Sequence, residues 1–213
     1  MADIFREVDE ALKEDKAKVL WQRYGSAAIA IVVLVVLATG GYVFWQDYSL
    51  RRDQERTAAL MAAVELADAE RSAAVDALER LADEAGDRQG LLARLHGAAL
   101  LAEAGDTAAA VAAYRELADD RSVAAPWRDL GRFLAVLHDL ESGDRNALTE
   151  ELAPLMVEES PWRHSARELE GLIALRAGDS ARAREIFSAL ADDPQTPGRQ
   201  RQRAQALADV AGS

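Results

Sequence analysis

The chain has 213 residues, enough for one soluble domain, and carries a formal net charge of −12. Because an acidic surface repels polyanions, nucleic acid is not an expected ligand. The absence of cysteine excludes disulfides and thiolate chemistry. The charge is uneven, with six acidic and five basic residues before Gln46 and 31 acidic residues against 20 arginines from there on.

Residues 1–23 are expected to form an amphipathic helical lead-in. Ile4, Val8 and Leu12 recur at helical spacing with Phe5 beside them, and the opposite face is charged. Two interpretations remain open. The helix lies at the headgroup level of a membrane, or it docks onto a membrane partner. The candidate contacts for such a partner are Ile4, Phe5, Val8, Leu12, Gly40 and Gly41.

Residues 24–46 contain no charged side chain and predict a transmembrane helix. About twenty helical residues span the roughly 30 Å hydrocarbon core. Gly40-Gly41 could let another helix approach closely. A cleaved signal peptide and a buried soluble helix are the alternatives, but the long charged segment before the run favours a retained anchor. Aromatic residues at both ends resemble interfacial belts: Trp21, Tyr24, Tyr42, Phe44, Trp45 and Tyr48.

The flanking charges favour a cytoplasmic N-terminus. Four basic residues precede the predicted span closely and three follow it, which is a weak positive-inside signal. All three lysines of the chain lie before the span. We therefore expect a single-pass protein whose C-terminal domain lies on the other side of the membrane.

Beyond the span, the sequence predicts an all-α fold. Residues 47–57 are polar without a helix breaker, so they are expected to be a helical extension or linker. Ser72 is the expected start of the next helix, which would end at Gly86-Asp87. No segment shows the period-two alternation of a half-buried strand.

Gly-Asp pairs punctuate the remaining chain. At each pair we expect a glycine with positive φ to end one helix and the aspartate to cap the next one. Each pair would thus be a tight corner between two helices. The pairs are Gly86-Asp87, Gly105-Asp106, Gly143-Asp144 and Gly178-Asp179.

The segments between these corners repeat. Pro126-Trp127-Arg128 aligns with Pro161-Trp162-Arg163 at an offset of 35 residues, and each proline is expected in the first turn of a helix. We expect both tryptophans to be packing anchors rather than ligand platforms. Arg94 to Asp120 also matches Arg167 to Asp193.

These features resemble the tetratricopeptide pattern, in which small residues meet inside each helix pair. The matching residues are Ala98 with Ala110, Gly171 with Ala183, and the aromatics Tyr114 and Phe187. The middle unit departs from the pattern, with Val136, Leu148 and Leu152 instead. We therefore expect residues 58–213 to form a degenerate tetratricopeptide-like α-hairpin array. Its final helix, from Gly198, would be a polar cap with Ala204, Leu207 and Val210 in the core and Arg199, Arg201 and Arg203 exposed.

No catalytic, cofactor or metal site is expected. His96, His138 and His164 belong to different units, and none has a partner at a recognised metal or triad spacing. No phosphate-binding glycine loop or nucleophile motif is present. The acidic doublets are expected to be solvated surface: Asp119-Asp120, Glu150-Glu151, Glu158-Glu159 and Asp192-Asp193.

Binding is therefore the expected activity. In tetratricopeptide arrays the first helix of each unit lines a concave groove, and a mostly apolar lining would suit an apolar peptide or a partner helix. The alternative is that a C-terminal helix fills the groove as core. The candidate lining residues are Leu92, Leu95, Ala99, Leu130, Phe133, Leu137, Glu168, Leu172 and Arg176.

The chain as a whole resembles the ancillary SecYEG translocon subunits of the YfgM-like family. The likeness lies in Leu20 to Gly25, in the anchor ending Tyr42 to Trp45, and in Arg199 to Ala208. It implies a bacterial inner-membrane protein with a periplasmic domain. It also implies contact with the Sec translocon and with a periplasmic chaperone, and no catalytic residue. We expect the array to bind such a partner or newly exported chains. An accessory subunit of another inner-membrane complex, such as a respiratory complex, is the alternative.

Overall fold

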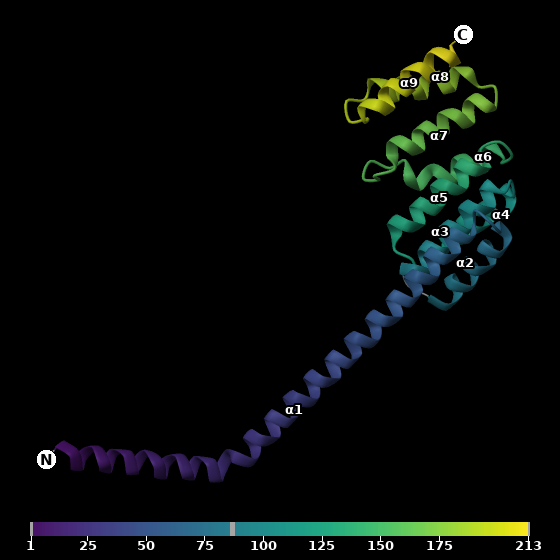
Figure 1. The fold of residues 1–213 in the computed structure, drawn as a ribbon. Coiled ribbons are helices and arrows are strands. Elements are labelled where there is room, and N and C mark those ends of the chain that lie inside the picture. Colours follow the sequence, from purple (N-terminus) through teal and green to yellow (C-terminus); the bar gives the residue numbers. More distant parts are fainter. Residues whose placement is uncertain (1, 86–87, 213) are drawn as a thin grey trace. The chain divides into compact units, whose positions relative to one another are not determined.

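The computed structural model describes residues 2–85 and 88–212, and before Val33 it describes the side chains of Arg23 and Ile31 alone. Every regular element in these ranges is helical (Figure 1). This confirms the expected all-α fold for the described residues. The chain divides into two compact units, Met1–Glu55 and Arg56–Ser213.

Helix α1 runs from Ala2 to Leu66 and contains the predicted lead-in, span and extension in one element. Its aromatic side chains after residue 40 are exposed, and Phe44 reaches 75% exposure. A Cβ at Gly40 or Gly41 would meet no neighbour within 4 Å. Within the part of the chain that the structure describes, none of the helices is long and apolar enough to cross a membrane.

Most side chains in the first part of the predicted anchor lie outside the described residues. The side chains of residues 24–30 and 32, in the predicted span, are not among them. The same holds for the four candidate contacts in the lead-in, Ile4, Phe5, Val8 and Leu12. The transmembrane helix and its partner contacts therefore stay predictions.

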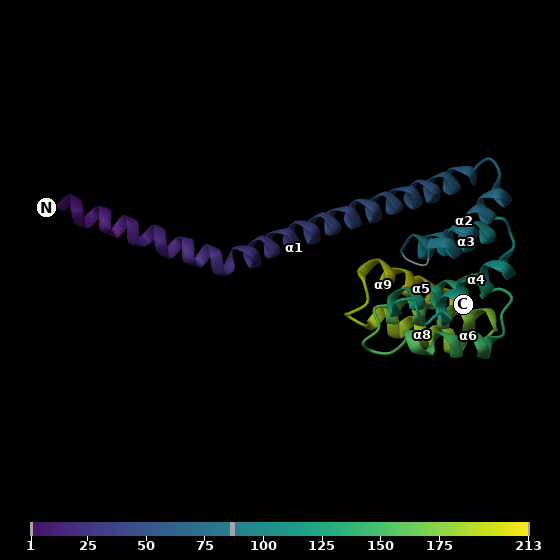
Figure 2. The same ribbon diagram turned by 90° about the horizontal axis from the view of Figure 1, so that it is seen from below.

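The second unit is a series of helices in which each packs against the next, as the two views show together (Figures 1 and 2). Helix α2 begins at Arg71, one residue before the predicted start. The elements are α2 (Arg71–Ala85), α3 (Arg88–Glu103), α4 (Thr107–Asp119), α5 (Ala125–Asp139), α6 (Arg145–Leu152), the 3₁₀ turn η1 (Ala153–Leu155), α7 (Arg163–Arg176), α8 (Ser180–Asp192) and α9 (Gly198–Ala211).

Two of the predicted corners have the expected geometry. Gly105 has φ of +84° and Gly178 has φ of +75°, a region where glycine escapes the Cβ penalty. The following Asp106 accepts from Ala109 N at 3.1 Å, and Asp179 accepts from Arg182 N at 3.2 Å. Each aspartate therefore caps the next helix as expected. The Gly86-Asp87 corner lies outside the described residues.

The corner at Gly143 corrects the expectation. Asp144 does cap α6 through Asn146 N and Ala147 N, both at 3.0 Å. However, Gly143 does not have positive φ, because α5 ends at Asp139 and a turn fills residues 140–143. A Cβ there would lie 2.8 Å from Asp139 Oδ2. A side chain at this position would require Asp139 and Leu148 to shift, whereas the backbone conformation does not require glycine.

The core is a chain of apolar clusters between successive helices. Ala98, Ala110 and Tyr114 share one cluster, and Ala183 and Phe187 share another. This confirms the small and aromatic positions of the repeat. In the middle unit, Val136, Leu148 and Leu152 are fully buried together.

Two expectations about helix starts and faces are wrong. Pro126 lies in the first turn of α5, but Pro161 precedes α7, which begins at Arg163. A turn comes first because Ser160 Oγ accepts from Trp162 N at 3.2 Å and Ser160 O accepts from Arg163 N at 3.2 Å. Val210 is 62% exposed, since the buried stripe of α9 follows a different register: Gln200, Ala204, Ala208 and Ala211.

Candidate interaction surface

Helix α5 presents an exposed apolar face. Leu137 is 40% exposed and Trp127 is 38% exposed, while Leu130, between them in sequence, is half-buried. The buried residues of α5, Gly131, Ala135 and Val136, point elsewhere. Since the first helix of a tetratricopeptide unit lines the concave side, Leu130 and Leu137 stand where a partner could contact them.

The candidate residues on α3 are divided between core and surface. Leu92 is half-buried and packs against the cluster that contains Leu60 and Leu78. Leu95 is also half-buried and packs against the cluster of Ala98 and Tyr114. Ala99 is half-buried as well. These positions offer a partner only part of their surface.

Phe133 and Leu172 belong mainly to the interior. The ring of Phe133 stacks on Trp162, with centroids 5.2 Å apart, and both side chains pack against the same apolar cluster. Leu172 packs against two neighbouring clusters. Trp162 is thus a packing anchor as predicted, whereas Trp127 is more exposed than that interpretation expected.

The two charged candidates have contacts inside the fold. Glu168 is 8% exposed and accepts from Gln200 Nε2 at 2.8 Å and Arg203 Nη2 at 2.7 Å. Arg176 donates to the carbonyls of Leu140 and Gly143. The sequence did not reveal these contacts, because each joins residues more than thirty positions apart.

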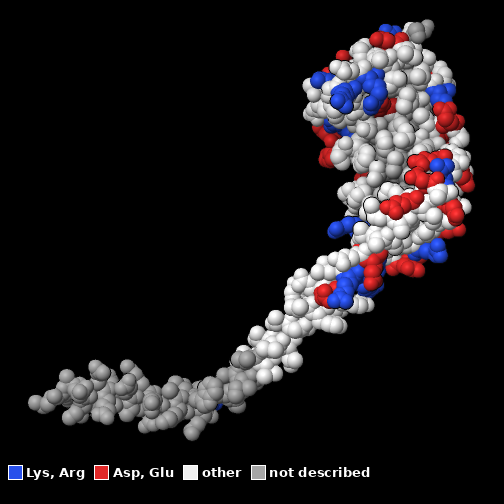
Figure 3. Space-filling view, in the orientation of Figure 1, with Lys and Arg blue, Asp and Glu red and all other residues white. Residues whose placement is uncertain are grey.

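Helix α9 packs on α8 at the end of the array (Figure 1). It thus continues the series of helices, with Glu168 of α7 as its polar contact. The view in Figure 3 shows basic side chains gathered near α9 and a largely uncharged area between that end and α3. An uncharged area of this kind fits a partner with an apolar contact face.

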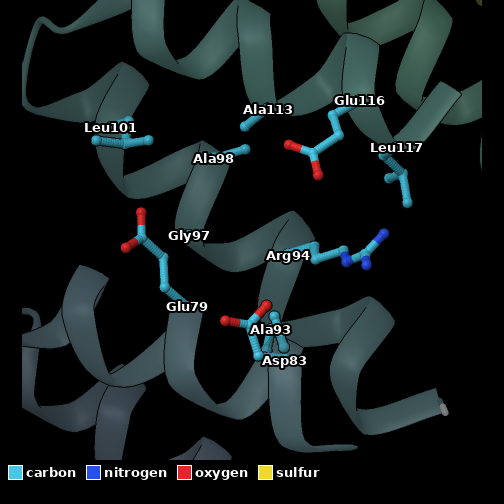
Figure 4. Close-up of a pocket in the computed structure, with 11 residues that line it drawn as sticks. Glu79, Asp83, Ala93, Arg94, Gly97, Ala98, Leu101, Ala113, Glu116 and Leu117 are labelled. Carbon is cyan, nitrogen blue, oxygen red and sulfur yellow. The ribbon is translucent and has the colours of Figure 1, made fainter. Parts of the chain in front are cut away.

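A cavity of about 250 Å³ lies between α2, α3 and α4 (Figure 4). Arg94 extends away from Glu79 and donates to Asp120 Oδ2 at 2.7 Å. Small residues form part of the lining, and carboxylates stand at its border. The lining comprises Glu79, Ala82, Asp83, Ala93, Arg94, Gly97, Ala98, Leu101, Ala113, Glu116 and Leu117.

The carboxylates of the structure are mostly partners of arginine. Arg115 of α4 bridges Asp139 and Glu151, each with an oxygen 2.9 Å away. The second members of three acidic doublets, Asp120, Glu151 and Asp193, are paired with arginines, which corrects the expectation of solvated carboxylates. The repeat alignment contained one hint of these ion pairs, because Arg94 and Asp120 stand at the two ends of one aligned unit.

These contacts shift the acidity of several groups. Hydrogen bonds from Ser122 and Arg94 lower the pKa of Asp120 to about 2. The pKa of Asp179 is lowered chiefly by the hydrogen bond from Arg145.

The described residues contain no group of three or more histidines or carboxylates arranged to hold a metal ion. His138 stacks on Tyr114, with centroids 5.4 Å apart.

The family model of the tetratricopeptide repeat-like domain matches residues 18–203. A comparison with curated proteins found no match, and a comparison with solved structures found none either.

Proposed function

The chain belongs to the tetratricopeptide repeat-like domain family, and we propose that it is a non-catalytic interaction protein tethered to a membrane by α1. Domains of this kind mediate protein–protein contacts, and a partner is the expected ligand. The observation that carries the proposal is the apolar face of α5, where Leu137 and Trp127 remain exposed in an otherwise acidic domain.

The proposed tether is supported by the sequence of α1 and by its described side chains. Residues 24–46 carry no charge. Aliphatic residues 33–37 are all more than half exposed, and no described side chain covers them. Tyr42, Trp45 and Tyr48 follow, and the guanidinium carbon of Arg52 lies 5.7 Å from the ring centroid of Tyr48. An aromatic and basic border suits the headgroup region of a bilayer.

The finer proposal is an accessory subunit of the Sec translocon region in the bacterial inner membrane. It would link the translocon to periplasmic chaperones or exported chains. The support is the resemblance of the lead-in, anchor and final helix to the YfgM-like family. An accessory role in another inner-membrane complex, such as a respiratory complex, is the alternative that the same experiment distinguishes.

The test is affinity purification of the full chain from native membranes, with Leu137→Asp as the altered surface. We expect the wild type to recover translocon subunits or periplasmic chaperones, and the variant to lose the partner that contacts α5. Val157→Asp is the matched control, because Val157 is 50% exposed in the segment between η1 and α7. Equal recovery by all three proteins would refute the role of α5.

The proposed topology needs its own measurement. Alkaline phosphatase is active only outside the cytoplasm, so a fusion after residue 213 should be active. A fusion that is expressed but inactive would place the array in the cytoplasm and contradict the proposed topology. Release of the intact chain into the soluble fraction after gentle lysis would refute the tether.

A further inference from the structure

A cluster of polar side chains connects the start of α7 to the segment before α9. We call it the His164 cluster, and its members are Arg163, His164, Gln195 and Thr196. His164 Nδ1 lies 3.1 Å from Thr196 Oγ1. Arg163 Nη2 donates to Gln195 Oε1 at 2.9 Å. Thr196 is only 2% exposed, and the side chain of His164 is 14% exposed. His164 and Thr196 are therefore largely shielded from water, whereas Gln195 is exposed, and the two hydrogen bonds hold residues 195–196 in place.

The contacts determine the protonation state of His164. Arg163 Nη2 lies 3.1 Å from His164 Nε2. A guanidinium nitrogen can only donate, so Nε2 must be the acceptor and carry no proton. The remaining ring proton is then on Nδ1, where it donates to Thr196 Oγ1. The arrangement requires the neutral imidazole.

The charges around His164 also disfavour a protonated, positively charged imidazole beside Arg163. The side chain of Arg163 is 11% exposed, and its Nε is buried without a hydrogen-bond partner. On α7, Arg163 and Arg167 face the imidazole, and from the end of α8 Asp193 approaches with Oδ2 3.8 Å from Nδ1. Burial first, and then Arg163, lower the pKa of His164, and the opposing effect of Asp193 is smaller.

The helix that follows this cluster has a thin apolar contact. The buried residues of α9 are three alanines and Gln200, with Leu207 packed at the border. Alanine side chains bury little surface compared with leucine, so they contribute little hydrophobic stabilisation. Besides this contact with Ile186, Phe187 and Leu190 of α8, α9 is held by hydrogen bonds to Glu168, and the segment before α9 is held by the His164 cluster.

We propose that the His164 cluster is a proton-sensitive latch whose opening releases α9 from the end of the array. A proton taken from water by Nε2 places an N–H against the Nη2–H of Arg163, so the two groups must separate. Arg163 holds Gln195 and His164 holds Thr196, so these two hydrogen bonds of the preceding segment are lost together. Movement of α9 then uncovers the apolar cluster that contains Ile186, Phe187 and Leu190.

Hydrogen exchange of the full chain in mild detergent tests the latch. The measured quantity is the opening equilibrium constant of residues 193–211, obtained from the exchange rates after correction for intrinsic exchange. We expect this constant to increase as the pH is lowered from 7.5 to 5. The increase is limited to about tenfold for each unit by which the folded-state pKa lies below the usual value near 6.5. Protection of α4 and α5 should stay unchanged. Equal loss of protection across the array, or no change in α9, would overturn the proposal.

Two histidine variants separate the latch from a general effect of acid. His164→Asn keeps an N–H near the position of Nδ1 but cannot take up a proton, so the pH response of α9 should disappear. His96→Asn is the matched control, since His96 is exposed on α3, and it should respond like the wild type. Retention of the response in His164→Asn would overturn the proposal.

The wild type supplies a further test that does not depend on a variant folding. The ring proton signal of His164 in NMR spectra of the folded chain should titrate at the folded-state pKa, whereas the opening of α9 should increase as the pH falls from about 6.5 and level off below that pKa. A folded ring that titrates at or above about 6.5 would overturn the latch, because protonation would then not favour opening.

Discussion

The ring of Phe187 occupies the space that a side chain at position 171 would need. A Cβ on Gly171 would lie 2.5 Å from Phe187 Cε1 and 2.7 Å from Cζ. Phe187 of α8 is fully buried in a cluster to which α7, α8 and α9 all contribute. The close approach of α7 and α8 therefore depends on glycine at one position and a large ring at the other.

Gly171→Ala is expected to destabilise the array. The added methyl must displace a packed ring, and overpacking of this kind costs roughly 1–3 kcal/mol. Urea unfolding of the full chain in detergent measures the loss. Gly171→Ala combined with Phe187→Leu should recover part of it, because the smaller side chain makes room. Gly198→Ala is the control, since nothing lies within 4 Å of a Cβ there.

Substitutions at Gly178 test the energetic cost of a positive φ without the added cost of a steric clash. Its φ is +75°, and a Cβ there would meet no atom within 4 Å. Gly178→Ala should therefore lose about 1 kcal/mol purely from the left-handed conformation. Gly178→Asn should lose less, because asparagine tolerates that conformation better than alanine. Thermal unfolding compares them, and equal stability of the alanine variant and wild type would contradict the interpretation.

Asp120 should make stability depend on acid pH. Its folded-state pKa is about 2, below the ordinary value of 3.8, because Ser122 and Arg94 stabilise the carboxylate. The stabilisation is present in full above about pH 3.8 and is lost as the pH falls from there through 2. Asp120→Asn should remove this part of the pH dependence. Asp119→Asn, at the exposed neighbour, should leave it intact in unfolding curves measured from pH 5 to pH 2.

Arg115 should contribute more to stability than an ordinary surface arginine. It joins α4 to Asp139 of α5 and Glu151 of α6, whose side chains are 16% and 18% exposed. Arg115→Gln leaves two half-buried carboxylates without their cation, and a loss of about 1 kcal/mol is expected, reduced at high salt. Arg121→Gln changes an exposed arginine and should alter the unfolding midpoint little. Equal effects of the two variants would argue against the bridge.

The sequence predicted the helical architecture because its signals act over short distances. Glycine at 105 and 178 and aspartate at 106, 144 and 179 act on the backbone within three residues, and their local geometry agrees with the prediction. The pairing of Ala98 with Ala110 also followed from repeat spacing. The membrane anchor remains a prediction from the uncharged run, together with its proposed contacts.

The sequence predicted only part of the candidate interaction surface. Repeat register alone cannot tell whether a first-helix residue faces a partner or a neighbouring helix. Leu137 remains exposed, whereas Phe133, four residues earlier, is covered by Trp162. The residue that precedes α7 decides between these outcomes, because the Trp162 ring stacks on Phe133.

An all-α chain of repeated helix pairs with capped corners follows from the sequence alone, because helix propensity, capping and repeat spacing are properties of neighbouring residues. The packing of the helices was needed to show that Arg115 reaches residues 24 and 36 positions away, that Glu168 contacts α9, and that His164 lies against Arg163 and Thr196. Such contacts depend on how successive helices are rotated and stacked, and local preferences do not specify that rotation.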